Sequence, residues 1–169
     1  MQEQGLLREP SALILTMAER TPPQLAARLA LTLDRGRGHC LLALDEGAEP
    51  DETAPQGMSE RIAFFVDLSD VGIGDITGFP PEAEELQQGR AALQRVTIPA
   101  EVPQQITTIC LQFGIDSLRA ARFTLRAARA HAALSGHVSV TSGDAEVACV
   151  LTFAHRVAQF PQTEPPAPR

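Results

Sequence analysis

The stretch Ser11–Pro23, SALILTMAERTPP, decides the fold that the sequence predicts. Its apolar run, 12–17, is short and continuous, which is typical of a strand covered on both faces. Residues 21–24 form a capping-box pattern with proline in the first turn, so we expect a helix over about 22–36. HCLLAL (39–44) predicts a second buried strand. Strand, helix and strand form a βαβ unit, which implies a parallel sheet and an α/β fold.

Composition argues against several classes of function. The chain has 169 residues and a formal net charge of −7, and all 14 of its Lys and Arg residues are arginine. Without lysine it cannot contain a GxxxxGK[ST] phosphate loop, and its acidic balance argues against a nucleic-acid-binding surface. No apolar run is long enough to span a membrane, and no signal-peptide pattern opens the chain. We expect the three cysteines to be buried free thiols in a reducing cytoplasm, namely Cys40, Cys110 and Cys149.

The second half of the chain predicts a helical subdomain. A stretch rich in glycine and proline, 71–80, separates it from the α/β part. Helical segments are expected at about 81–95, 99–113, 117–134 and 144–159, the last opened by a capping box at Thr141 to Asp144. The expected divisions are an α/β core (1–70), a connection (71–80), a helical bundle (81–160) and the start of a proline-rich acidic linker (161–169).

The two predicted strands end at the edge where open parallel sheets meet their ligands. The first strand ends at Thr16 and Met17, where a nucleotide-hydrolysing protein would place two acids to hold Mg²⁺. The second leads into the acidic loop 45–57, for which a ligand-facing loop and a merely solvated loop are the alternatives. A third apolar run, IAFFVDL (62–68), follows that loop.

The segment 117–134 carries an unusual charge pattern. Its four arginines are spaced by three, four and three residues, which stacks the guanidinium groups along one stripe: Arg119, Arg122, Arg126 and Arg129. Other side chains can then face the bundle, namely Leu118, Leu125, Ala128 and Ala132. Stacked like charges repel one another unless an anion meets them. The alternatives are a solvated basic face and a contact with phosphate or with an acidic partner.

Several segments, in this order, resemble the AAA+ module of magnesium chelatase. They are LLALDEGAEPDE (41–52), MSERIAFFVDL (58–68), which matches an arginine followed by an apolar strand, and IDSLRAARFTLRAARAHAALSG (115–136), which matches the helix with the sensor 2 arginine. The resemblance spans roughly residues 5–160 and is greatest to the D subunit of the bacteriochlorophyll pathway. It implies a partial AAA+ parallel-sheet core followed by a small helical lid, without the P-loop region and the C-terminal integrin-I-like domain.

The resemblance also implies roles for single residues. Thr16 and Met17 stand at the Walker B place without its acids, so this subunit is expected not to hydrolyse ATP. Glu46 replaces the usual sensor 1 asparagine. Arg61 aligns with the arginine finger, which such rings offer to a neighbour's ATP, and Arg119 aligns with the sensor 2 arginine of the lid.

The function implied by the resemblance is that of a non-hydrolysing AAA+ subunit of magnesium chelatase, a ligase that forms nitrogen–metal bonds. It would assemble into a ring with the active I-type ATPase. The ring would support ATP-dependent Mg²⁺ insertion into protoporphyrin IX, which the H subunit carries. ATP and Mg²⁺ would bind at the neighbouring active subunit, the complex would be cytoplasmic, and this chain would hold no metal of its own.

Two other classes stay open. An inactive MoxR-like AAA+ adaptor would bind a partner without a catalytic role, and Arg61 would then be dispensable for a neighbour's ATPase rate. A stand-alone enzyme is disfavoured, because the chain has no GxSxG elbow and its four histidines show no metal-ligand spacing. These histidines are His39, His131, His137 and His155, of which His131 and His137 are expected on a helix surface and in a loop.

Overall fold

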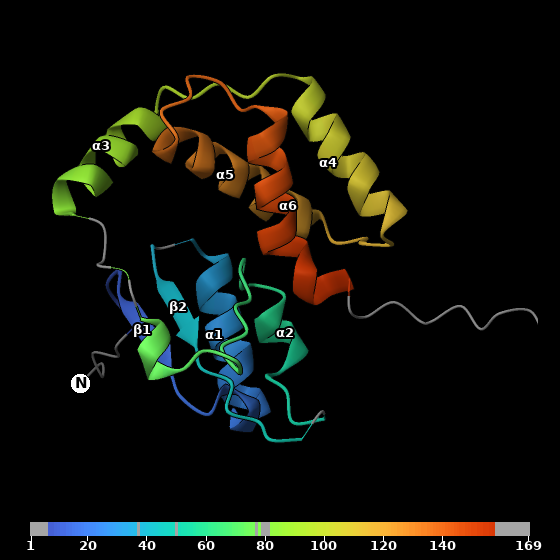
Figure 1. Cartoon of the computed structure of the whole chain (residues 1–169). Helices are drawn as coiled ribbons and strands as arrows, with labels where there is room; N and C mark the ends of the chain where they lie inside the picture. Colours follow the sequence, from blue (N-terminus) through green and yellow to red (C-terminus); the bar gives the residue numbers. More distant parts are fainter. Residues whose placement is uncertain (1–6, 37, 50, 77, 79–81, 158–169) are drawn as a thin grey trace, which may run out of the picture. The chain divides into compact units, whose positions relative to one another are not determined.

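The structure is a computed structural model that describes residues 7–36, 38–49, 51–76, 78 and 82–157. The chain divides into two compact units, residues 1–62 and 63–169 (Figure 1). The predicted connection 71–80 falls within the second unit, so its role as a boundary stays a prediction. The predicted linker, 161–169, lies outside the described residues.

The first unit is built on a two-stranded parallel sheet. Strand β1 (Ala12–Leu15) pairs with β2 (Cys40–Ala43), with Ala12 opposite Cys40 and Leu15 opposite Ala43. Helix α1 (Pro23–Asp34) forms the crossover between the strands, after the single 3₁₀ turn η1 (Ala18–Arg20). The predicted βαβ unit and the α/β fold class are confirmed.

The sheet of the first unit is covered on one face only. Leu29 of α1 and Met58 of the short helix α2 (Gln56–Ser59) pack with alternate strand residues, which are Leu13, Leu15, Leu41 and Ala43. On the opposite face Ile14 is 68% exposed and Leu42 is 55% exposed. The prediction of strands covered on both faces is therefore wrong, because no described helix of this unit packs on the second face. The expected burial of Cys40 fails for the same reason, since its side of β2 is exposed.

Helix α1 begins within one residue of its predicted start but is capped differently. Pro22 is the N-cap residue and offers no side-chain hydrogen bond. The hydroxyl of Thr21 is buried and has no hydrogen-bond partner among the described residues. The predicted capping box at 21–24 is therefore wrong. At the other end Gly36 has a φ of 62°, a left-handed conformation that glycine adopts easily at a helix terminus.

The apolar run 62–68 does not form a strand. Phe64, Phe65 and Val66 are exposed in an irregular segment that follows α2. A strand is stable only when its backbone N–H and C=O groups bond to a neighbouring strand, and none in the described part of the chain pairs with this run. The expectation of a strand at 62–68 was therefore wrong, because it depended on apolar content alone.

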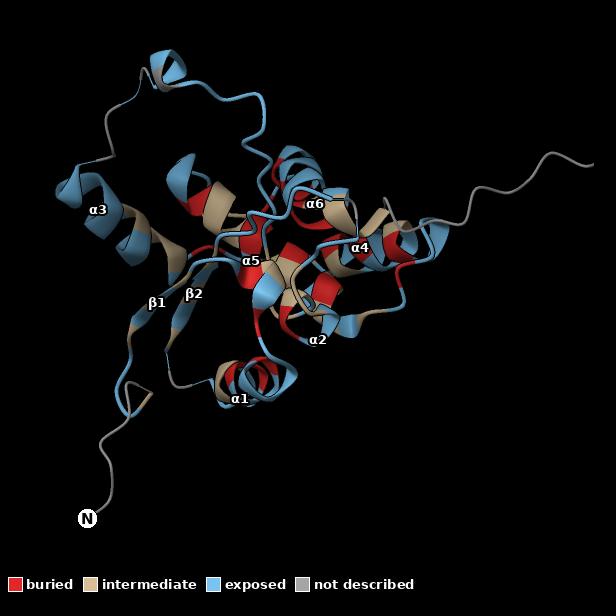
Figure 2. Ribbon diagram, turned by 90° about the horizontal axis from the view of Figure 1, so that it is seen from below, coloured by how far each residue is buried: buried red, intermediate tan, exposed pale blue. Residues whose placement is uncertain are grey.

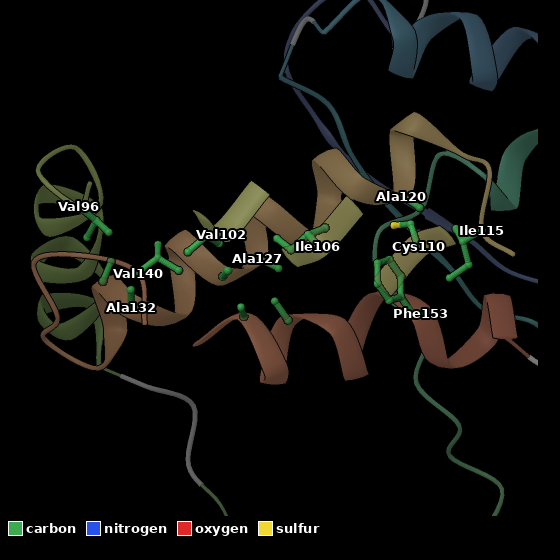
Figure 3. Packing of buried hydrophobic residues seen from close by; sticks show 14 residues of the cluster. Val96, Val102, Ile106, Cys110, Ile115, Ala120, Ala127, Ala132, Val140 and Phe153 are labelled. Atoms are coloured by element: carbon green, nitrogen blue, oxygen red, sulfur yellow. The ribbon is translucent and has the colours of Figure 1, made fainter. Parts of the chain in front are cut away.

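The second unit contains the four predicted helices. They are α3 (Ala83–Leu93), α4 (Glu101–Gln112), α5 (Leu118–Leu134) and α6 (Ser142–Val157), preceded by the 3₁₀ turn η2 (Ile73–Asp75). Buried residues concentrate on α5 and α6, whereas α3 has none (Figure 2). Val102, Ile106 and Cys110 of α4 pack against the alanine-rich face of α5 and against Phe153 of α6 (Figure 3). Small alanine side chains allow helices to approach closely, which explains this core.

Local capping fixes where the helices of the second unit begin and end. The Ser117 hydroxyl accepts a hydrogen bond from the backbone N–H of Ala120, 3.3 Å away, and thus caps α5. Gly136, with a φ of 75°, follows the end of α5. The predicted capping box before α6 is confirmed. The Asp144 N–H donates to Thr141 Oγ1 at 3.2 Å, and the Thr141 N–H donates to Asp144 Oδ2 at 2.8 Å. None of the helices described is both long and apolar enough to cross a membrane.

Candidate functional site

Backbone hydrogen bonds join the carboxyl ends of the two strands. Thr16 and Met17 follow β1 with exposed side chains, and Met17 is in the left-handed conformation at φ 49° and ψ 52°. The Leu44 N–H donates to the Leu15 carbonyl at 2.8 Å, and the Ala18 N–H donates to the Leu44 carbonyl at 2.9 Å. These bonds place Thr16 and Met17 beside the start of the acidic loop.

Glu19 is a carboxylate at this edge that sequence reasoning missed. Its side chain is only 3% exposed, and Oε2 accepts the backbone N–H of Glu46 at 3.0 Å, while Oε1 lies 3.5 Å from Arg20 Nε. The sequence signal that could have identified Glu19 is an acidic residue two positions after Met17, just past the predicted first strand. Thr16, Met17 and Glu46 thus lie at one edge of the sheet, and their assignment to a degenerate nucleotide site stays a prediction.

The donor atoms at this edge do not fit a Mg²⁺ site. Thr16 offers a hydroxyl and Met17 a thioether, whereas hard cations prefer carboxylate oxygens. Glu19 already accepts the Glu46 N–H and lies beside Arg20. Among the described residues, no group of three or more His, Cys, Asp or Glu side chains is arranged to hold a metal ion.

Residues 45–54 of the acidic loop are held in shape by acids of the loop itself. Asp45 accepts the N–H groups of Gly47 and Ala54 at 3.1 and 3.0 Å, and Glu52 accepts the N–H of Ala48 at 3.1 Å. A Cβ atom at Gly47 would lie 2.3 Å from the Glu52 carbonyl oxygen, so this close approach requires glycine. The remaining carboxylates are exposed and have no hydrogen bond or ion pair within the described part of the chain; they are Glu46, Glu49 and Asp51.

Arg61 lies away from Thr16 and Met17. Its Nε and Nη2 donate to Asp34 Oδ2 at 3.0 and 2.5 Å, and its Nη1 donates to the Gly57 carbonyl at 2.5 Å. Asp34 is the last residue of α1, whose first turn follows β1. Twelve helical residues rise by about 16 Å, so Arg61 is found at the opposite end of α1 from Thr16. The structure therefore does not bring Arg61 to this chain's own strand ends.

The arginine stripe of α5 divides into two parts. Arg122 and Arg126 are exposed, and neither has a hydrogen bond or an ion pair among the described residues. Arg129 is half-buried and donates from Nη2 to the Leu93 carbonyl of α3 at 2.7 Å, and Arg119 is half-buried. Leu118 is 84% exposed, so the prediction that it faces the bundle is wrong. The α5 face in the core consists of Ala120, Thr124, Ala127, Ala128, Ala132 and Ala133.

A polar cluster that sequence reasoning missed joins α5 to α6. Asp144 is 1% exposed, and its carboxylate accepts hydrogen bonds from both the N–H and the hydroxyl of Thr141. His131 Nδ1 lies 2.7 Å from Oδ1, and His137 Nδ1 lies 3.0 Å from Oδ2. Burial raises the pKa of the Asp144 carboxyl, but the hydrogen bonds from Thr141, His131 and His137 outweigh it and hold the pKa well below its usual range. The ionised carboxylate therefore accepts an Nδ1–H from both imidazoles.

His155, near the end of α6, is a different kind of histidine. Burial, together with the nearby charge of Arg156, lowers its pKa to about 4. Its ring stacks on that of Phe65, with centroids 5.7 Å apart and an interplanar angle of 28°. The imidazole is therefore neutral near pH 7, and it attaches the irregular segment after α2 to the end of α6.

Comparison with known proteins connects these features to a family. A model described as the AAA lid domain matches residues 103–169. The chain is 46% identical over 166 residues to the magnesium-chelatase 60 kDa subunit of Cereibacter sphaeroides, covering 98% of this chain and 30% of that protein. The chain is a relative of the magnesium-chelatase 60 kDa subunit. The subunit from Rhodobacter capsulatus is also 46% identical, over 96% of this chain and 29% of its own length.

The match to the magnesium-chelatase 60 kDa subunit covers less than a third of that protein's length. A crystal structure of a candidate ATPase from Cytophaga hutchinsonii aligns with a TM-score of 0.59 and 14% identity, covering 83% of this chain and 56% of that one. At this identity the likeness shows the fold alone. Together with the lid match, it confirms a partial AAA-type α/β core followed by a helical lid.

Proposed function

We propose that this chain is part of a non-hydrolysing AAA+ subunit of magnesium chelatase. It would assemble with the active I-type ATPase subunit and help to couple ATP hydrolysis to Mg²⁺ insertion into protoporphyrin IX, carried by the H subunit. The observation that carries the proposal is the combination of two facts. The chain is 46% identical to magnesium-chelatase 60 kDa subunits over nearly its whole length, and β1 is followed by Thr16 and Met17 in place of the two acids that would hold Mg²⁺ for hydrolysis.

The position of Arg61 supports a role in trans. A finger that serves a neighbour's nucleotide has to lie away from its own subunit's nucleotide edge, and Arg61 stands at the opposite end of α1 from Thr16. Its bonds to Asp34 and Gly57 would have to open before the guanidinium could reach a partner's phosphate. ATP and Mg²⁺ would accordingly bind at the neighbouring active subunit, with Arg119 sensing nucleotide from the lid.

One observation favours the alternative of an inactive adaptor. The Arg61 guanidinium makes three hydrogen bonds within its own unit, which is the arrangement expected of a structural arginine. An adaptor would bind the ATPase without changing its rate through Arg61.

The deciding measurement is the ATPase rate of a purified I-type chelatase subunit with and without this chain. The chain is expected to hydrolyse no ATP alone and to change the partner's rate. Arg61→Ala should abolish that effect, because arginine fingers contribute about 10³–10⁵ to turnover where they operate. Arg28→Ala is the matched control, since Arg28 is an exposed arginine on α1.

Two results would count against the proposal. If the Arg61→Ala protein binds the ATPase subunit and changes its rate as the wild type does, Arg61 is not an arginine finger and the adaptor alternative is favoured. If the chain hydrolyses ATP by itself, the non-hydrolysing role is wrong. Co-elution of the two proteins with ATP present separates loss of binding from loss of rate.

A further inference from the structure

We propose that a cleft at the end of α3 binds the phosphate group of a small molecule through Arg95 and His137. The cleft has a volume of about 210 Å³ and lies between the end of α3 and the connection from α5 to α6. The residues that line it are Ala92, Arg95, Val96, Gly136, His137 and Val138. The site does not depend on the proposed role in ATP hydrolysis, and it lies at the opposite end of α5 from Arg119.

The walls of the cleft are part of the folded second unit. The Thr97 N–H donates to the Val138 carbonyl at 3.0 Å, and the Val140 N–H donates to the Thr97 carbonyl at 3.0 Å, so the segments after α3 and before α6 lie side by side (Figure 1). Val96 is buried and packs in the same core as Val140 (Figure 3). A site whose walls are already ordered loses little conformational entropy when a ligand binds.

The chain around the cleft is strongly basic. Residues 86–100 and 117–143 contain six arginines and two histidines but no acidic residue, although the whole chain has a net charge of −7. Arg95 is exposed, and its guanidinium has no hydrogen bond or ion pair among the described residues. The local charge therefore attracts an anion to this end of the unit.

A second arginine beside the cleft lacks an opposite charge. Arg129 is half-buried, and its Nη2 donates to the carbonyl of Leu93, the residue next to Ala92 of the cleft wall. Its Nε is buried without a hydrogen-bond partner in the described part of the chain, where no carboxylate forms an ion pair with it either. A partly buried charge without a counter-charge is unfavourable. A bound anion would therefore stabilise this arrangement.

His137 is held in place for such a ligand. Its Nδ1 lies 3.0 Å from Oδ2 of Asp144, which is only 1% exposed, so Nε2 on the other side of the ring is directed away from that carboxylate. With Nδ1–H donated to Asp144, Nε2 can donate only after it takes a proton from solvent. The Asp144 carboxylate and a bound phosphate both favour the resulting imidazolium. The other charged or titratable groups near His137 are His131, which shares the carboxylate, and the guanidinium groups of Arg95 and Arg129.

The chemistry and size of the cleft favour a phosphate group. A guanidinium can donate to two phosphate oxygens at once, and an imidazolium N–H can donate to a third. The volume of about 210 Å³ is below the range of about 300–1,000 Å³ that is usual for pockets of drug-sized ligands. The cleft therefore suits a phosphate group whose attached molecule, if there is one, extends into solvent. Inorganic phosphate and a small phosphomonoester share this chemistry.

The test is a ¹H–¹⁵N NMR titration of the 169-residue chain with inorganic phosphate at constant ionic strength, adjusted with sodium chloride so that charge screening does not change. We expect saturable shifts of the Val96, Gly136 and Val138 amides with a Kd of about 1 mM, as for a few charged hydrogen bonds. Arg95→Gln should weaken binding at least about tenfold. Arg126→Gln is the matched control, because it removes the same charge at an exposed position outside the cleft, and its Kd should stay within about twofold of the wild type.

Sulfate tests the part played by His137, because sulfate keeps both of its charges at neutral and mildly acidic pH. Sulfate should bind more tightly at about pH 6 than at about pH 8, and it should move the titration of the His137 ring to higher pH. His137→Gln should weaken binding and remove that pH dependence. This variant also loses a bond to Asp144 and can be less stable, whereas Arg95→Gln should melt within about 2 °C of the wild type.

Glycerol 3-phosphate separates the two sources of the phosphate group. A Kd equal to or lower than that of inorganic phosphate assigns the cleft to a phosphomonoester, and a Kd at least about tenfold higher assigns it to the free anion.

Three results would overturn the inference. These are the absence of saturable shifts up to about 20 mM phosphate, an Arg95→Gln protein that binds as the wild type does, and shifts confined to the amides around Arg122 and Arg126, which would assign the anion to the exposed face of α5. If phosphate does not bind while the chain still changes an I-type subunit's ATPase rate, the proposed function stands without this site. If phosphate binds and that rate is unchanged, the site stands and the proposed function fails.

Discussion

Replacing Asp144 by asparagine should destabilise the second unit strongly, although the two side chains have nearly the same shape. The carboxylate accepts hydrogen bonds from Thr141, His131 and His137 on both of its oxygens. An asparagine turns one of these acceptors into an NH₂ donor. With the amide nitrogen turned toward Thr141, two donors face each other; turned toward the histidines, it meets Nδ1 atoms that can accept only after their proton has moved to Nε2.

The size of this effect follows from the groups that lose their partner. A hydrogen bond to a charged group contributes about 1.5–3 kcal/mol, and a buried donor left unpaired costs about 1–3 kcal/mol. The two imidazoles are 38% and 44% exposed, so water can replace part of their loss. We therefore expect a loss of about 2–4 kcal/mol, which corresponds to a fall of about 10–20 °C in the melting temperature of a unit of this size.

The assay is thermal unfolding followed by circular dichroism at pH 7, with hydrogen exchange of the amides at the start of α6. Glu146→Gln is the matched control, since Glu146 is an exposed acid on the same helix, and it should shift stability by less than about 0.5 kcal/mol. Because the pKa of Asp144 is lowered by folding, its contribution is present above the unfolded pKa of about 4 and is lost as the pH falls through the folded value. An Asp144→Asn protein as stable as the Glu146→Gln control would refute this reasoning.

Three further predictions concern backbone strain, a buried hydroxyl pair and a neutral histidine. Met17→Gly should stabilise the first unit by about 0.5–1 kcal/mol in urea unfolding, whereas Met17→Val should destabilise it, because only glycine is unstrained at a φ of 49°. The hydroxyls of Thr124 and Thr152 lie 2.7 Å apart in the core. Either Thr→Val change should cost about 1 kcal/mol, and the double change less than the sum, as a double-mutant cycle would show. His155 has a pKa of about 4 when folded, so stability should decline as the pH falls from about 6.5 to 4, and melting curves of His155→Gln should lack that decline.

Much of the fold could be predicted because its signals are local. The succession of strand, helix and strand and the capping box at Thr141 depend on residues within a few positions of each other. The run 62–68 failed because a strand depends on a partner, and apolar composition does not say whether one is present. The exposed Leu118 shows the same limit of prediction. Helical spacing is compatible with more than one buried face of α5, and the alanine face is the one that packs in the core.

The candidate site could be predicted only where the chain order itself brings residues together. Thr16 and Glu46 lie at the same edge of the sheet because both parallel strands end there. The pairing of Arg61 with Asp34 joins residues 27 positions apart, and the two histidines reach Asp144 from the end of α5 and from the following loop. No local pattern encodes such pairs, because they depend on how helices pack after they have formed. The roles of Arg61, Arg119 and Glu46 stay predictions that the proposed assays test.

The cluster around Asp144 bears on the order in which the lid is built. Its members come from residues 131–144, so closing this loop costs little chain entropy, and contacts near in sequence form quickly. We expect the α5–α6 hairpin to nucleate the unit. Helices α3 and α4 are synthesised earlier, yet α3 buries none of its residues, and Ile106 and Cys110 of α4 pack in the core that α5 and α6 complete. During translation α4 is therefore synthesised before the two helices that bury it. A nascent chain keeps the apolar face of α4 exposed until α6 has left the ribosome.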